Sequence, residues 1–210
     1  MFLHQNGTPV LEVFRIHTQK NFNNLIHMKI IKTGIKDCYI IEPKLFADKR
    51  GYFFESFNKK KFESLTAMKV EFVQDNESFS KFGTIRGLHI QKGKMMQAKL
   101  VRVIHGKVKD VVIDVRPDSP TFNKKFEIEI SAINKKQLFV PKGFLHGFSV
   151  LSETAIFSYK CDNYYDRASE SGVNPLDQTL NINWDLKDKE YLISQKDLSL
   201  NNFNNFSFLD

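Results

Sequence analysis

The sequence has few of the features that mark disulfide-rich, zinc-binding or membrane proteins. Its 210 residues include only two cysteines, Cys38 and Cys161, which lie far apart and form no CxxC pair. This argues against a disulfide framework or a zinc knuckle. The longest apolar runs are strand-sized, well short of the roughly 18 residues of a membrane span, and the first residues lack the pattern of a secretory signal. We therefore expect a soluble, cytoplasmic protein without a membrane partner.

Motifs for nucleic-acid binding are also absent, although the formal net charge is +7 and the sequence pI is about 9.3. The lysines are scattered, apart from the short run Lys59, Lys60 and Lys61. No helix-turn-helix, zinc-finger or RNP pattern accompanies them. This predicts a solvated basic surface and no nucleic-acid partner. A small anionic ligand such as a nucleotide diphosphate stays open, because a few positioned arginines would hold it.

Short alternating segments predict a β-rich domain from residue 28 onward. In "KLVRVI", "KVKDVVIDV" and "AIFSYKC", β-branched and aromatic residues alternate with polar ones, and turn signals separate such segments. One helix is predicted over 58–68, with Asn58 as its N-cap. Many short strands without a βαβ repeat favour a mainly β fold, an antiparallel jelly-roll or cupin-like barrel with a few short helices.

The distribution of these alternating segments along the chain also predicts the domain organisation. Residues 28–210 are predicted to form one domain, and residues 1–27 an extension to which no role can be assigned. A chain of this length with 41% hydrophobic residues buries one core of useful size. For the tail "NNFNNFSFLD", a docked and a frayed end are both compatible with the sequence.

Four ionisable residues lie on strand faces that are otherwise apolar. Strand alternation predicts, for example, that His89 shares a face with Ile85 and Gly87. Taken singly, such residues are often hydrogen-bonded core histidines, packed tyrosines or lysines that reach solvent. Together they predict a polar pocket inside the barrel, because burying a lysine without compensation is costly. The four residues are His89, Lys99, His146 and Tyr159.

A metal centre is the main alternative for such a pocket. Cupin-type metal sites use a His-x-His pair with a following carboxylate and a further histidine. No His-x-His occurs in this chain, and His89 is followed by Ile90 and Gln91. The sequence therefore predicts no metal ligand set.

Four consecutive blocks resemble the dTDP-4-dehydrorhamnose 3,5-epimerase family of deoxysugar biosynthesis. They are "FVQDNESFSKFGTIRGLHIQ", "QAKLVRVIHGKVKDVVIDVRPDSPTF", "LFVPKGFLHGFSVLSETAIFSYKCDNYY" and "SGVNPLDQTLNINW", and the likeness runs from about residue 30 to 197. The resemblance implies a cupin jelly roll, usually a homodimer with strands exchanged or paired across its interface, and no metal or organic cofactor. It also implies a nucleotide-sugar substrate, dTDP-4-dehydro-6-deoxy-glucose, epimerised at C3 and C5 to dTDP-4-dehydro-L-rhamnose.

The resemblance also implies roles for individual residues. His89 corresponds to the catalytic base, Asp197 to the carboxylate that orients it, and Tyr159 to the general acid. Lys99 and His146 correspond to the residues beside the C4 oxygen. The implied substrate-binding residues, of which Tyr165 stacks on thymine, are Arg50, Glu55, Gln74, Asn76, Arg86, Tyr165, Glu170 and Lys196.

Two departures from many members leave the product open. Ile90 stands where an aromatic residue often follows the histidine, and "NPLD" (174–177) replaces a segment of the "WND" type. The alternatives are a 3-epimerase or 5-epimerase acting on a related nucleotide 4-ketosugar, and a non-catalytic cupin that binds sugar nucleotides. The pathway's final sugar is not fixed by the sequence.

Overall fold

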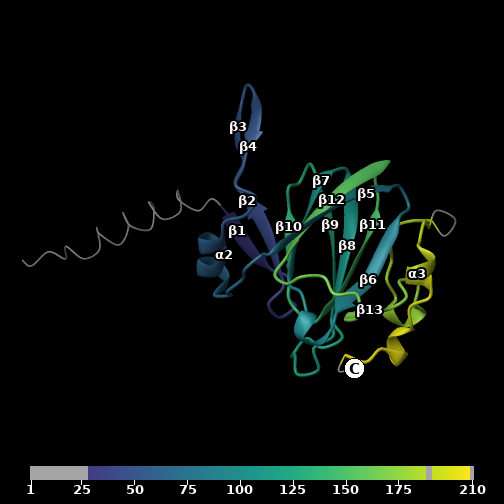
Figure 1. Cartoon of the computed structure of the whole chain (residues 1–210). Coiled ribbons are helices and arrows are strands. Elements are labelled where there is room, and N and C mark those ends of the chain that lie inside the picture. Colours follow the sequence, from purple (N-terminus) through teal and green to yellow (C-terminus); the bar gives the residue numbers. More distant parts are fainter. Residues whose placement is uncertain (1–27, 188–190, 209–210) are drawn as a thin grey trace, which may run out of the picture.

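The structure is a computed structural model that describes residues 28–187 and 191–208. The predicted extension, residues 1–27, lies outside the described residues. Two antiparallel sheets pack face to face, and a two-stranded hairpin projects from the body near one end (Figure 1). The prediction of a mainly β, jelly-roll barrel is confirmed.

The larger sheet has six antiparallel strands in the order β1-β2-β10-β7-β12-β5. Its edges are therefore β1 and β5, and its centre is formed by strands far apart in sequence. The strands are β1 (Met28–Lys32), β2 (Tyr39–Pro43), β5 (Gln74–Lys81), β7 (Lys99–His105), β10 (Gln137–Val140) and β12 (Thr154–Cys161).

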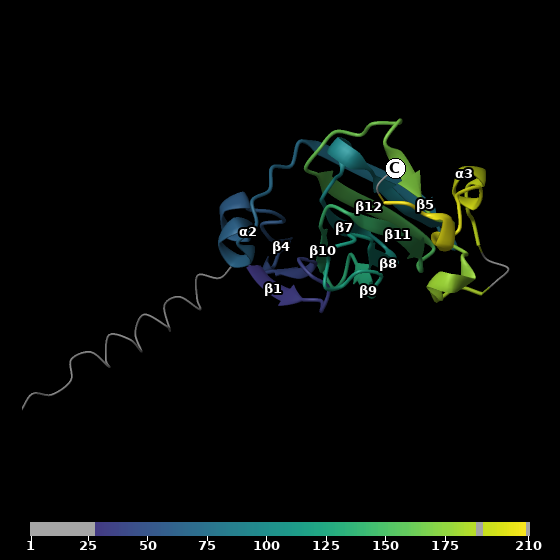
Figure 2. The ribbon, with the colours of Figure 1, turned by 90° about the horizontal axis from the view of Figure 1, so that it is seen from below.

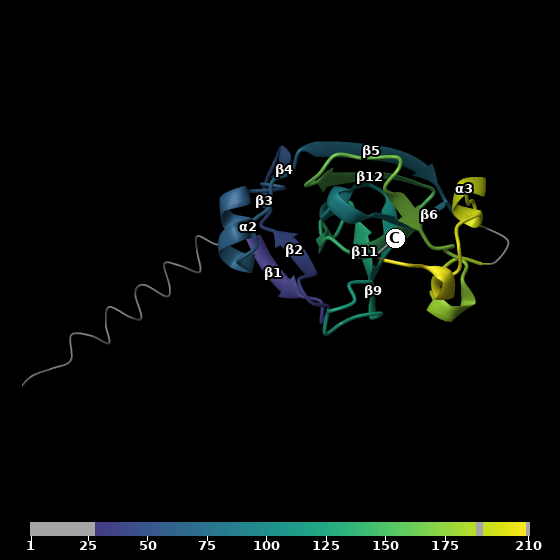
Figure 3. The ribbon, with the colours of Figure 1, turned by 60° about the horizontal axis from the view of Figure 1, so that its bottom comes forward.

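The smaller sheet has five antiparallel strands in the order β13-β6-β11-β8-β9. In Figure 3, β5 and β12 of the larger sheet cross above β11 of the smaller one. The five strands are β6 (Ile85–Gln91), β8 (Lys107–Asp114), β9 (Lys125–Ser131), β11 (Phe144–Val150) and β13 (Glu170–Gly172). The remaining elements are β3 (Phe46–Asp48), β4 (Gly51–Phe53), α2 (Lys59–Thr66), η1 (Gly93–Met95), η2 (Gln178–Leu180), α3 (Gln195–Leu198) and η4 (Phe203–Asn205).

Apolar side chains fill most of the space between the two sheets. Val101 and Val103 of β7 and Phe157 of β12 meet Phe144 and Phe148 of β11 in one buried cluster. The rings of Phe148 and Phe157 stack with their centroids 4.2 Å apart. The cluster therefore places apolar residues on the same strand faces as Lys99, His146 and Tyr159, which confirms that these three ionisable residues lie on otherwise apolar faces.

The predicted helix forms as α2. The Asn58 side chain accepts a hydrogen bond from the Lys61 backbone N–H at 3.1 Å, which satisfies one of the free amides of the first turn. Phe62 is the buried residue of the helix and packs on Phe139, with ring centroids 4.8 Å apart. Ala67 adopts a left-handed conformation, φ 58°, and ends the helix.

The C-terminal segment packs against the outer face of the smaller sheet. Trp184 is buried there with Ile85 and Leu145, and Phe203 and Phe206 cover the same cluster. Figure 2 shows α3 in this segment at the end of the molecule opposite α2. Of the two alternatives that the sequence left for the tail, the structure shows the docked one up to residue 208.

Gly87 breaks the alternation of β6, and one prediction fails here. Its φ of +129° is a conformation that favours glycine, and a Cβ there would lie 2.5 Å from the Gly147 Cα. Beyond Gly87, Leu88 and Ile90 join Ile85 in the outer apolar cluster. His89, between them, therefore points to the opposite face, so the prediction that it shares a face with Ile85 is wrong.

Candidate active site

A cavity of about 480 Å³ lies between the sheets and is lined from both sides. His89 of β6 and His146 of β11 come from the smaller sheet, whereas Lys99 of β7 and Tyr159 of β12 come from the larger one. The structure thus brings together all four ionisable residues that the strand patterns singled out. Three further predicted site residues line the same cavity, namely Arg86, Lys196 and Asp197.

His89 is held by the carboxylate of Asp197. His89 Nε2 lies 2.9 Å from Asp197 Oδ1, and the Gly87 backbone N–H donates to Oδ2 at 3.3 Å. Burial by itself raises the pKa of Asp197, but its hydrogen bonds and the nearby His89 outweigh that effect and hold the pKa below its ordinary value. In the tautomer that donates from Nε2, the Nδ1 lone pair of His89 is free to accept a proton.

Asp110 is a site residue that the sequence reasoning missed. Its side chain is fully buried on β8, and His146 Nε2 lies 3.1 and 3.0 Å from its two carboxylate oxygens. Alternation along β8 puts Asp110 on the same face as Val108 and Val112, which are core residues. The criterion that singled out His89 and Lys99, an ionisable group on an apolar face, would have found it.

Lys99 places a positive charge in the cavity without a partner. No hydrogen bond or ion pair to its ammonium occurs within residues 28–187 and 191–208, and its nearest described contact is the Tyr159 ring, 5.9 Å from Nζ to the centroid. Burial lowers the pKa of Lys99, although the nearby Cys161, Asp110 and Glu170 act in the opposite direction. An uncompensated ammonium in such a place favours a ligand oxygen that carries or develops negative charge.

Tyr159 stands on the wall opposite His89. Its ring packs beside that of Phe157, with centroids 6.1 Å apart. Burial raises the pKa of Tyr159, and the nearby Cys161 and Glu170 add to the effect. The phenol is therefore protonated at neutral pH and able to donate.

Five of the predicted binding residues are connected by hydrogen bonds. Gln74 donates from Nε2 to Asn76 Oδ1 at 3.0 Å and accepts the Tyr165 backbone N–H at 2.9 Å. The Tyr165 hydroxyl donates to Glu170 Oε2 at 2.8 Å, and Lys196 Nζ lies 2.6 Å from the same oxygen. Gln74, Asn76, Tyr165 and Glu170 line a cavity of about 260 Å³ that shares His89, Lys99 and Tyr159 with the larger one.

Arg86 also lines the main cavity, and its guanidinium has no ion-pair partner among the described residues. Its guanidinium donates to Ser80 Oγ at 3.1 Å and to the Phe79 carbonyl at 3.4 Å. Both partners are neutral, so they orient the guanidinium and leave its charge for a ligand. An arginine in this state suits phosphate oxygens.

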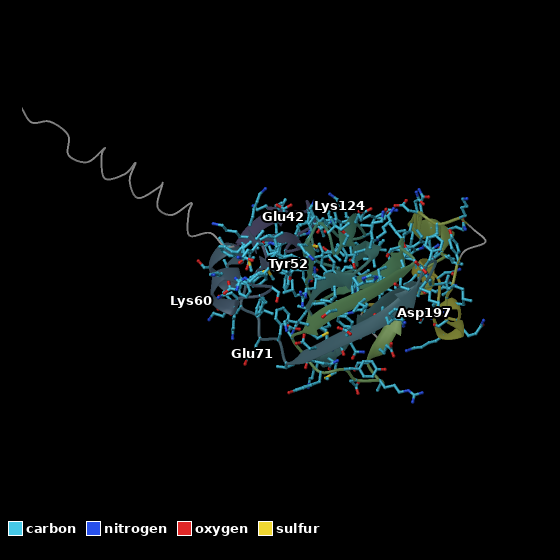
Figure 4. All side chains as sticks on the ribbon, turned by 90° about the horizontal axis from the view of Figure 1, so that it is seen from above. Glu42, Tyr52, Lys60, Glu71, Lys124 and Asp197 are labelled. Atoms are coloured by element: carbon cyan, nitrogen blue, oxygen red, sulfur yellow. The ribbon has the colours of Figure 1, made fainter. Side chains whose placement is uncertain are left out.

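Arg50 and Glu55 are not brought to the cavity within one chain. Arg50 lies in the turn of the β3–β4 hairpin and pairs with Asp48 at 2.6 Å, and Glu55 pairs with Lys61 at 2.6 Å. The hairpin projects away from the barrel in Figure 1. Figure 4 shows the labelled Tyr52 of this hairpin on the side of α2, away from Asp197.

The described part of the chain contains neither a metal-binding cluster nor a membrane-spanning helix. No group of three or more His, Cys, Asp or Glu side chains among those residues is arranged to hold a metal ion. No helix among them is long and apolar enough to span a membrane.

A comparison with protein families gives a match over residues 32–205 to the family model described as dTDP-4-dehydrorhamnose 3,5-epimerase. The chain belongs to this family. The resemblance inferred from the sequence blocks is therefore confirmed, and the matched range contains every predicted site residue.

Individual relatives agree with this assignment. The dTDP-4-dehydrorhamnose 3,5-epimerase of Shigella flexneri is 49% identical over 172 residues, covering 82% of this chain and 94% of the relative. The crystal structure of that enzyme from Elizabethkingia anophelis NUHP1 superposes with a TM-score of 0.82 at 54% identity, covering 85% of this chain and 97% of that one. The dTDP-6-deoxy-D-glucose-3,5-epimerase of Legionella pneumophila was solved with dTDP-4-keto-L-rhamnose. It gives a TM-score of 0.82 at 45% identity, covering 86% of this chain and 95% of the Legionella chain.

Proposed function

We propose that this protein epimerises dTDP-4-dehydro-6-deoxy-glucose at C3 and C5, giving dTDP-4-dehydro-L-rhamnose. The observation that supports this best is the placement of His89 and Tyr159 on opposite walls of one cavity that also contains the unpaired Lys99. The 3,5-epimerase names of the relatives and the sugar nucleotide bound to the Legionella enzyme support the same substrate class.

The chemistry starts from the ketone at C4 of the substrate. It acidifies the hydrogens on both neighbouring carbons, C3 and C5, because the electron pair left by proton removal is delocalised onto the ketone oxygen. Reprotonation of the resulting enolate from the opposite face inverts the carbon. Such a reaction needs a base, an acid facing it and positive charge beside the oxygen.

We assign proton removal to His89. The Asp197 carboxylate fixes its ring, and proton transfer from carbon to Nδ1 produces an imidazolium that this carboxylate stabilises. Tyr159 then donates its phenolic proton to the other face of the same carbon, and solvent restores both residues. Because these steps use only side chains of this protein, we propose that the reaction needs no metal or organic cofactor.

Lys99 and His146 stabilise the enolate oxygen in this scheme. The Lys99 ammonium has no other described partner, so its full charge is available to the developing negative charge. His146 is oriented by Asp110, which makes Asp110 a positioning residue. One such donor contributes about 10²- to 10³-fold in rate.

The lowered pKa of Lys99 predicts an alkaline limb in the pH profile. Because the ammonium is the active form, kcat/KM is expected to fall as pH rises through that pKa, below the ordinary lysine value of 10.5. The raised pKa of Tyr159 moves the loss of its phenolic proton to higher pH. Lys99→Arg keeps the charge and is expected to remove the limb from its residual activity. A limb that stayed in Lys99→Arg and vanished in Tyr159→Phe would contradict this assignment.

We further propose that the protein is a homodimer in which the hairpin of each chain reaches the partner's cavity. The hairpin and the edge strand β5 expose large aromatic side chains, with Tyr52, Phe53 and Phe79 57%, 69% and 59% exposed. A second chain would cover them, and it would bring Arg50 and Glu55 to a site that lacks them in the monomer. Sedimentation equilibrium is expected to give twice the 24.5 kDa chain mass, and a monomer would contradict the proposal.

The cytoplasmic location stays a prediction.

The proposed reaction is tested by coupling it to a dehydrorhamnose reductase and NADPH. The purified protein is incubated with dTDP-4-dehydro-6-deoxy-glucose, and the reduced sugar is identified by NMR. The expected product is dTDP-L-rhamnose. A product inverted at a single carbon would change the assignment to a 3-epimerase or 5-epimerase, and dTDP binding without any conversion would favour the non-catalytic cupin.

A further inference from the structure

A third cavity adjoins the site on the side of the loop that carries Tyr165. It has a volume of about 500 Å³, and His89, Tyr165, Arg167, Glu170 and Lys196 are among its lining residues. His89 and Lys196 also line the main cavity, so the two spaces meet at these side chains. A ligand that occupies the main cavity and extends past Lys196 therefore enters the space lined by Arg167.

The charges of this third cavity are unevenly compensated. Lys196 is paired with Glu170 at 2.6 Å, which also accepts the Tyr165 hydroxyl. Arg167, in contrast, has no hydrogen bond or ion pair within the two described ranges of the chain, and it is exposed. Its guanidinium therefore keeps a full positive charge beside the neutralised pair of Lys196 and Glu170.

The backbone on both sides of Arg167 is fixed. The Asp166 backbone N–H donates at 2.9 Å to Oε1 of Gln91, whose side chain is buried. The Asp166 carboxylate accepts the Ser169 backbone N–H at 2.8 Å and the Ser169 hydroxyl at 2.6 Å. Arg167 thus starts from a held position, which lowers the entropy that a ligand contact costs.

We propose that Arg167 is a phosphate contact for the nucleotide diphosphate. Arg86 lines the main cavity and Arg167 the adjoining one, and the two cavities share His89 and Lys196. Two guanidinium groups without an ion-pair partner in the described ranges match the negative charge of a diphosphate, and arginine binds phosphate oxygens bidentately. This inference rests on the proposed function, which supplies the nucleotide ligand.

The test compares dTDP with thymidine by isothermal titration calorimetry. Arg167→Ala is expected to weaken dTDP binding by about 5- to 20-fold, as for the loss of one charge-assisted hydrogen-bonded contact, and to leave thymidine binding unchanged. Added salt is expected to reduce the difference between wild type and variant, because it screens an exposed charge. In the epimerase assay, KM is expected to rise with kcat preserved.

Lys94→Ala is the matched control. Lys94 is an exposed cation beside the same loop, since its carbonyl accepts the Asn163 side chain at 3.0 Å, but it does not line the three cavities of the site. The Lys94→Ala substitution removes one positive charge near the site and leaves the proposed Arg167 contact in place. Equal dTDP affinities for Arg167→Ala and Lys94→Ala would overturn the inference alone, as would an equal loss for thymidine and dTDP. A wild-type protein that bound no dTDP would overturn the proposed function as well.

Discussion

His89→Ala is expected to abolish deuterium exchange at both C3 and C5 of the substrate and to lower kcat by about 10²- to 10⁴-fold, the usual contribution of a general base. Both hydrogens flank the same ketone, and His89 lines the cavity with its ring held through Nε2 by Asp197, which leaves Nδ1 to accept a proton. Loss of exchange at both carbons together would indicate that one base serves both. Proton NMR in deuterated buffer measures it directly.

The same variant is expected to fold and bind dTDP like the wild type. The His89 side chain is 31% exposed to the cavity, so truncation leaves no sealed void in the core. Asp197→Asn provides the second variant, since it keeps the shape of the partner and removes its charge. We expect it to slow exchange at both carbons less than His89→Ala does. If His89→Ala retained most of its turnover, another group would have to be the base.

Tyr159→Phe is expected to separate the two halves of the reaction. His89 still removes the proton, so solvent deuterium enters the sugar, but the acid of the opposite wall is gone and inversion slows by about 10²- to 10⁴-fold. The fold is preserved, because the ring still packs beside Phe157. The ratio of exchange to inversion, taken from NMR and the coupled assay, checks this expectation.

Tyr164→Phe is the control for this change. Tyr164 follows the same strand, but it is 62% exposed and lines none of the three cavities. The Tyr164→Phe variant lacks one phenolic hydroxyl near the site but keeps the proposed acid. Deuterium exchange into the sugar and inversion of its carbons are therefore both expected to stay at the wild-type rate. If Tyr159→Phe inverted both carbons as fast as Tyr164→Phe, the acid would lie elsewhere.

Much of the fold and of the site is readable from strand alternation. Lys99 and Tyr159 interrupt runs of apolar residues whose neighbours, Val101 and Phe157, do pack in the barrel core. A polar group at such a position faces either a polar pocket or an apolar core, and burying it in an apolar core without a hydrogen-bond partner is costly. That physical constraint, rather than any single motif, makes these residues predictable. The cap at Asn58 is equally local and was predicted for the same kind of reason.

The parts of the structure that strand alternation does not predict depend on contacts between distant segments. At Gly87 the alternation of β6 shifts, and His89 lies on the opposite face from the predicted one. The Gly87 backbone lies against Gly147 of β11, and a two-residue periodicity cannot predict such a contact between strands. The pairing of His89 with Asp197 spans 108 residues and comes from the resemblance, not from spacing. The sequence predicts Arg50 as a site residue, yet within one chain it lies on the projecting hairpin and pairs with Asp48; the proposed homodimer would bring it to a cavity.

The most direct test of the central claim is proton NMR of the wild-type protein with dTDP-4-dehydro-6-deoxy-glucose in deuterated buffer. One base beside one activated ketone, with an acid on the opposite wall, predicts that deuterium replaces hydrogen at both C3 and C5 and that the label requires His89. Deuterium at C3 alone would contradict the assignment of a 3,5-epimerase. No deuterium at either carbon, with dTDP bound, would contradict enolate chemistry in this cavity altogether.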